Sequence, residues 1–123
     1  MSISLLSVLG DAMWIVAMAM IASGSQRFWK RLPAEVRVPM QWSLSQKPTW
    51  RAAKPLAFGL TVGIPLVVGL LLSAAARDPS IPPAEVLLVF LVRAFTAPLF
   101  VLVHYAWMRA SAATLEAEGA LKP

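Results

Sequence analysis

The chain has 123 residues, enough for one compact unit, and 59% of them are hydrophobic while only 14% are charged, which excludes an ordinary soluble domain. It contains no cysteine and one histidine, so the sequence excludes disulfide, thiolate and multi-histidine metal chemistry. The net charge of +5 does not indicate nucleic-acid binding, because seven of the eleven basic residues lie in one segment between hydrophobic runs, a pattern typical of membrane topology.

The first apolar run, residues 3–23, contains one charge, Asp11, and is followed by a basic and aromatic cluster at 26–31 that is expected at the lipid headgroups. A cleaved signal peptide is the alternative. Such a peptide carries positive charge before its apolar core, whereas the first basic residue here is Arg27. We therefore expect this run to remain in the protein as a membrane anchor.

Two further apolar runs, residues 56–76 and 86–108, also reach the length of about 20 residues that a membrane-spanning helix needs. Backbone polar groups in lipid must be satisfied within the segment, so all three runs predict helices. The sequence thus predicts an all-α membrane protein, a single transmembrane domain of three helices with a loop at 24–55 between the first and second. The C-terminal tail, residues 109–123, is expected to be a frayed helical extension.

Lysines and arginines indicate the orientation in the membrane. The loop holds seven of them, whereas the turn between the second and third runs has only Arg77, offset by Asp78 and Glu85. Since cytoplasmic loops carry an excess of positive charge, the loop is expected in the cytoplasm, with the N-terminus outside and the C-terminus inside. The implied location is the inner (cytoplasmic) membrane, and the anionic inner leaflet is an expected partner of the loop.

Within the loop, Met40, Trp42 and Leu44 alternate with polar residues, and this period of two predicts an extended segment. The Ser-Gln-Lys-Pro sequence at 45–48 predicts a turn, after which Trp50 is expected to fold back toward Trp42. The alternative is that the tryptophans are ordinary interfacial anchors at the headgroup level, beside the basic residues.

Several loop residues together resemble a known family: two prolines, polar and aromatic residues, and a lysine just before the second helix. They are Pro39, Gln41, Trp42, Pro48, Trp50 and Lys54. In this order, residues 32–72 resemble the short module of unknown function found in bacterial membrane proteins of the sporulation-delay immunity type. The sequence departs from that module where Gln41 stands in place of a histidine and Gln46 in place of a turn glycine. The resemblance implies a bacterial membrane protein of accessory or immunity-like character and no reaction.

Two smaller signals lie in the second and third helices. Gly59 and Gly63 form a small-xxx-small pattern, which lets helix backbones approach closely and predicts a packing face, either within the bundle or between two copies. His104 lies about one turn from the cytoplasmic end of the third helix, where an interfacial hydrogen-bonding residue is expected rather than a ligand or a proton relay.

Asp11 and Arg93 are charges inside apolar runs, where an unpaired charge costs at least about 2.5–3.5 kcal/mol. With three spans, both lie about 10–14 Å below the outer boundary at 1.5 Å per residue. We therefore expect an intramembrane ion pair. A contact of either charge with a partner subunit, or an ion or proton pathway, is the alternative.

No catalytic constellation or phosphate-binding loop occurs in the sequence, so we expect no enzyme, no cofactor, no metal and no nucleic-acid partner. Two functional classes remain. In the first, the chain is an accessory or immunity-like subunit that binds another membrane protein through its helix faces and its tryptophan-rich loop. In the second, it is a homo-oligomeric minimal transporter or channel that surrounds polar residues such as Asp11, Arg93 and Thr96, because three helices alone are too few to enclose a pathway.

Overall fold

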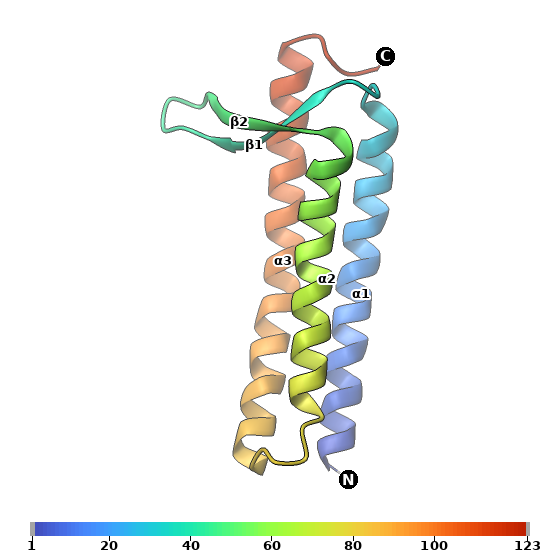
Figure 1. Cartoon of the computed structure of the whole chain (residues 1–123), viewed down its shortest axis with the longest axis vertical. Coiled ribbons are helices and arrows are strands. Elements are labelled where there is room, and N and C mark those ends of the chain that lie inside the picture. Colours follow the sequence, from blue (N-terminus) through green and yellow to red (C-terminus); the bar gives the residue numbers. More distant parts are fainter. Residues whose placement is uncertain (1, 123) are drawn as a thin grey trace.

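The computed structural model describes residues 2–122, which form a bundle of three helices and a β-hairpin (Figure 1). The elements are α1 (Ser2–Arg31), β1 (Arg37–Trp42), β2 (Pro48–Ala53), α2 (Lys54–Ala76) and α3 (Pro83–Ala117). All three helices are long and apolar enough to cross a membrane, so the predicted all-α fold with three transmembrane helices is confirmed. The two-stranded sheet is a small addition between the first two helices.

The bundle has two different ends. The N-terminus and the short turn between α2 and α3 lie at one end, which we call the turn end (Figure 1). The hairpin and the C-terminal segment lie at the other, the hairpin end. There the hairpin extends sideways across α3 and beyond it, so it runs roughly at right angles to the helices.

α1 and α3 are longer than their apolar runs. α1 continues to Arg31 and α3 to Ala117, whereas the sequence predicted spans ending near residues 23 and 108. The extensions are held by packing: Phe28, Met108 and Leu115 belong to one buried cluster at the hairpin end. The C-terminal extension is therefore helical as predicted as far as Ala117, but the prediction that it is frayed is wrong for residues 109–117, since Leu115 is fully buried.

The hairpin agrees with the predicted extended segment and turn. Its strands pair antiparallel, with Val38 opposite Ala52, and the turn closes with a hydrogen bond from Ser43 N to Lys47 O of 2.8 Å. Gln46 adopts a positive φ of 65° in this turn, a conformation that glycine adopts without strain.

A second buried cluster lies in the middle of the bundle, where Trp14, Ala17 and Ile21 of α1 pack against Ala97 and Val101 of α3. Outside these clusters, most large apolar side chains of the helices are exposed on the bundle surface. This distribution is expected for helices that face lipid rather than water.

Candidate functional site

The predicted ion pair of Asp11 and Arg93 forms between α1 and α3, with Arg93 Nη2 donating to Asp11 Oδ1. The Arg93 side chain is fully buried, and its Nη1 also donates to the carbonyl oxygen of Ser7 at 3.4 Å. Its Nε atom has no hydrogen-bond partner within residues 2–122. The Asp11 carboxylate therefore provides most of the interaction that offsets the cost of burying the guanidinium charge.

Asp11 has two further partners that the sequence did not predict, Ser73 in α2 and Arg77 directly after its end. Arg77 Nη2 donates to Asp11 Oδ2 at 2.5 Å, and the Ser73 hydroxyl donates to Asp11 Oδ1 at 2.9 Å. One carboxylate thus joins all three helices near the turn end. Thr96, the other polar residue considered there, donates to its own helix at Val92 O, 2.7 Å away.

The backbone of α1 passes close to the Arg93 side chain in this cluster. A Cβ atom on Gly10 of α1 would lie within 2.6–3.0 Å of the Arg93 guanidinium atoms, so α1 passes over Arg93 only because residue 10 has no side chain. In the same way, a Cβ on Gly69 of α2 would overlap the indole of Trp14. These two glycines allow the close helix packing within the bundle.

The prediction that Gly59 and Gly63 pack within the bundle is wrong. A Cβ at either position would meet no atom within 4 Å, because both lie on the side of α2 that points away from α1 and α3. The small-xxx-small pattern shows which face of a helix carries small residues. It does not show which face packs against the neighbouring helices. The alternative, a contact with another chain, stays a prediction.

The loop residues that resemble the family module fasten the hairpin to the helix ends. Pro39 accepts a hydrogen bond at its carbonyl from Trp107 Nε1 at 2.9 Å, and Trp42 Nε1 donates to the Thr114 hydroxyl at 3.0 Å. Lys54 is buried, and its ammonium donates to the Leu32 carbonyl at 2.8 Å. It also lies 4.1 Å from the centroid of the Trp29 ring. Lys54 thereby satisfies a carbonyl just after the last turn of α1.

Trp50 does not fold back onto Trp42. In the register, Trp50 lies opposite Gln41 and donates from Nε1 to the Gln41 side-chain oxygen at 3.1 Å, while Trp42 lies opposite Pro48. The two indoles line different grooves, one on each side of the hairpin. A glutamine at position 41 thus holds the second tryptophan of the hairpin.

An ion pair outside the spans also links the hairpin to α3. Arg51 donates to the two carboxylate oxygens of Glu118 at 2.8 and 2.5 Å. This bidentate contact lowers the pKa of the Glu118 carboxyl below its usual value. The charge pair fixes how the hairpin crosses α3 and its C-terminal extension.

His104 is buried between α1 and α3, where its Nε2 lies 2.6 Å from the Ser25 hydroxyl. This agrees with a hydrogen-bonding role, although the residue is inside the bundle rather than at the lipid interface. Within residues 2–122, no group of three or more histidine, cysteine, aspartate or glutamate side chains is placed to hold a metal ion.

A groove of about 280 Å³ lies beneath the hairpin, on the outer surface of α2 and α3. The hairpin residues Met40, Gln41 and Trp50 line its hairpin side, and mostly apolar residues of the two helices, together with Thr61 and His104, line the rest. At the hairpin tip, Leu44 is fully exposed. The hairpin therefore offers an apolar tip and an apolar underside at the edge of the bundle.

No protein-family model, no curated protein and no solved structure matches this chain. The likeness of residues 32–72 to the sporulation-delay immunity type remains a prediction from the sequence.

Proposed function

We propose that this protein is an accessory, immunity-like subunit of the bacterial inner membrane, which binds another membrane protein and catalyses no reaction. The hairpin end faces the cytoplasm and the N-terminus lies outside. Support for this orientation comes from charge: the seven lysines and arginines of residues 24–55 gather at the hairpin end, whereas Arg77 at the turn end is paired with Asp11.

The observation that carries the proposal is the fixed hairpin with an exposed apolar tip. Hydrogen bonds from Trp107, Trp42 and Arg51 hold the hairpin across α3, so it is an ordered arm rather than a loose loop. An arm that is ordered before binding loses little conformational entropy on contact with a partner. Leu44 in the hairpin turn is fully exposed, which leaves its side chain free for contact with a protein partner.

The outward face of α2 gives the partner a second contact. Gly59 and Gly63 leave a shallow gap in this face, with no atom of the bundle within 4 Å of a Cβ at either position. Small residues favour close contact between helices in lipid, where association depends on van der Waals packing. The second class, a channel of several copies, receives less support because Asp11, Arg93 and Thr96 make their contacts inside one bundle.

The deciding experiment is the mass of the particle extracted in mild detergent, for the natural chain and two variants. Leu44→Asp places a charge at the hairpin tip, and Thr49→Asp adds the same charge to the exposed side of β2. We expect a complex with a second protein that Leu44→Asp loses and Thr49→Asp keeps. A symmetric ring of this chain alone would contradict the proposal, as would equal behaviour of the two variants.

The orientation is tested separately with a reporter that is active only outside the cytoplasm. A fusion near Ser80, in the turn between α2 and α3, is expected to be active, and fusions near Gln46 or after the last residue are expected to be inactive. The reverse pattern would show that the hairpin end lies outside.

A further inference from the structure

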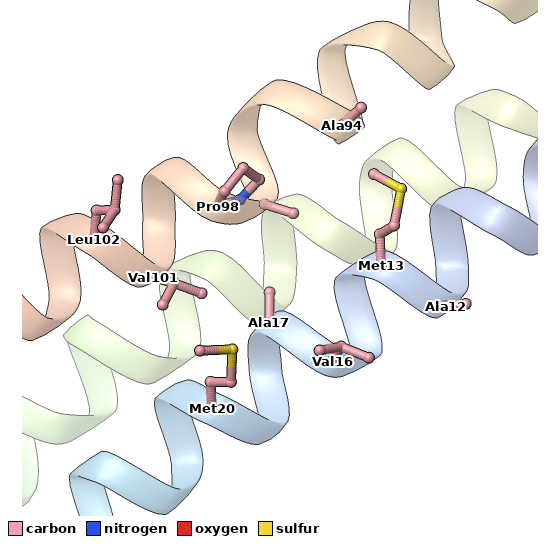
Figure 2. Close-up of a pocket in the computed structure, with 10 residues that line it drawn as sticks. Ala12, Met13, Val16, Ala17, Met20, Ala94, Pro98, Val101 and Leu102 are labelled. Carbon is pink, nitrogen blue, oxygen red and sulfur yellow. The ribbon is translucent and has the colours of Figure 1, made fainter.

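A long apolar groove runs between α1 and α3 on the side of the bundle that faces away from α2 (Figure 2). Its volume is about 640 Å³, and only side chains of these two helices line it. Met13, Val16 and Met20 border it on α1, and Ala94, Pro98 and Leu102 border it on α3. The alanines of α3 in its lining are too small to fill the space between the two helices, so the surface there is concave.

The same seam continues toward the hairpin end as a second groove of about 590 Å³ between the same two helices. Met13, Met20 and Arg27 follow at seven-residue intervals, which keeps them on one face of α1. The two grooves lie end to end along this seam, one apolar and one with arginines at its rim, and they adjoin where the Tyr105 hydroxyl of α3 donates to the Met20 carbonyl at 2.7 Å. A ligand that fills both grooves passes over this contact. We call the two grooves together the α1/α3 channel.

Three arginines surround the polar half of the α1/α3 channel: Arg27 and Arg31 from α1, and Arg109 from α3. Glu116 is the acidic residue on its rim, so positive charge prevails. None of the three arginines pairs with a carboxylate within residues 2–122, in contrast to Arg51 and Arg93. These guanidiniums are therefore available to an anion.

The arginines also lie at the right height for a lipid headgroup. Arg27 Nη1 donates to the Ser23 hydroxyl at 2.9 Å, one turn closer to the apolar half, so its guanidinium points back along the channel. From Met20 to Ala12 the apolar groove extends about 12 Å along α1 at 1.5 Å per residue. One leaflet contributes about half of the 30 Å hydrocarbon thickness, or about 15 Å. The apolar half therefore covers most of the depth that an acyl chain occupies in one leaflet.

We propose that the α1/α3 channel binds one anionic phospholipid, with its phosphate on Arg27, Arg31 and Arg109 and one acyl chain in the apolar half. Guanidinium groups bind phosphate through charge-assisted, often bidentate hydrogen bonds, which zwitterionic headgroups oppose with their own cation. A partner helix in the same place would have to bring its own acidic residues to the arginines. The inference depends on the proposed orientation only for the leaflet, which is then the inner one, and it does not depend on the proposed protein partner.

The test uses the whole purified protein in mild detergent and native mass spectrometry, with phosphatidylglycerol and phosphatidylcholine of identical acyl chains. We expect a single, preferred phosphatidylglycerol adduct. Each arginine near anionic lipid strengthens binding about fivefold, so Arg27→Gln with Arg109→Gln should weaken phosphatidylglycerol binding by about thirtyfold. The matched control, Lys30→Gln with Lys47→Gln, removes the same charge outside the channel and should keep the preference.

Two further measurements separate the headgroup from the acyl chain. A large excess of inorganic phosphate should not displace the lipid, because phosphate lacks the part that fills the apolar half. Ala94→Phe, which fills that half and leaves the arginines in place, should weaken the binding of both lipids. Equal affinity for the two lipids, equal loss in the arginine and lysine variants, displacement by phosphate, or full binding by Ala94→Phe would each overturn the proposal.

Discussion

Asp11 and Arg93 form one ion pair, but the structure predicts that losing one of them is far more damaging than losing the other. If Asp11 is replaced by asparagine, the fully buried Arg93 guanidinium keeps only neutral acceptors, the Ser7 carbonyl and the new amide oxygen, and loses its carboxylate. If Arg93 is replaced by glutamine, Asp11 keeps the guanidinium of Arg77 and the hydroxyl of Ser73. The carboxylate has reserve partners, whereas the buried arginine has none of comparable charge.

The magnitudes follow from that asymmetry. Removing one partner of a buried ion pair typically destabilises by about 3–5 kcal/mol, so we expect about 3–4 kcal/mol for Asp11→Asn. Arg93→Gln loses hydrogen bonds but strands no charge, and should destabilise by about 1–2 kcal/mol. The double variant should resemble Arg93→Gln alone. The resulting coupling free energy between the two positions is about 3–4 kcal/mol, the full effect of Asp11→Asn.

The assay is reversible unfolding by SDS in mixed micelles, followed by tryptophan fluorescence, for the single variants, the double variant and Arg77→Gln. The Arg77 side chain is 46% exposed, so its pair with Asp11 should contribute only about 0–1 kcal/mol. The reasoning is refuted if Arg93→Gln is as damaging as Asp11→Asn, or if the two effects add. Simple addition would mean that Asp11 and Arg93 are not partners in the membrane.

Three other predictions use the same unfolding assay or amide hydrogen exchange. Lys54→Met removes the ammonium that binds the carbonyl after α1 and should lower stability by about 1–3 kcal/mol, with faster exchange in the hairpin; unchanged exchange would contradict this. Gly69→Ala should destabilise by about 1–3 kcal/mol through overpacking, whereas Gly63→Ala should be neutral or slightly stabilising; equal effects would count against the described packing. Because the pKa of Glu118 is lowered in the folded state, its pair with Arg51 stabilises the hairpin above the usual carboxyl pKa and is lost as the pH falls through the lowered value. Hairpin exchange should rise in that acidic range in the natural chain, while Glu118→Gln should lack this step.

The sequence predicts the spans well but not the ends of α1 and α3. Run length and hydropathy determine where lipid can be crossed, and these properties end near residues 23 and 108. Beyond those points the helices continue because Phe28 of α1 and Leu115 of α3 belong to the same buried cluster at the hairpin end. Such contacts join residues far apart in the chain, so no local pattern reports them.

In the candidate site, too, the sequence predicted one contact and missed another. The pairing of Asp11 with Arg93 followed from depth, because only three spans bring both charges to one level. The third member, Arg77, was assigned to the turn by charge counting, since Asp78 and Glu85 are its sequence neighbours. In the structure its side chain turns back along α2 to Asp11 instead. The contact depends on which way the Arg77 side chain points, and the sequence does not determine that direction.

Glycine is the clearest case in which the pattern and the packing disagree. The recognisable pair Gly59 and Gly63 lies on the free face of α2, while Gly10 and Gly69, which belong to no motif, allow the close contacts. Their importance comes from the large groups that face them, a guanidinium and an indole. Only the arrangement of all three helices identifies those neighbours.

The bundle is held by clusters of directional contacts at both ends, and in between by packing with single hydrogen bonds such as that from Trp14 Nε1 to the Pro65 carbonyl at 3.0 Å. At the turn end one carboxylate joins three helices, and at the hairpin end the hairpin ties α1, α2 and α3 together. The middle is held mainly by packing around Trp14, since lipid offers no hydrophobic drive between helices. Because the two ends fix the helices, the surface between them does not have to be closed. This leaves the glycine face of α2 and the α1/α3 channel on different sides of the bundle, so the proposed protein partner and the proposed lipid do not compete for one surface.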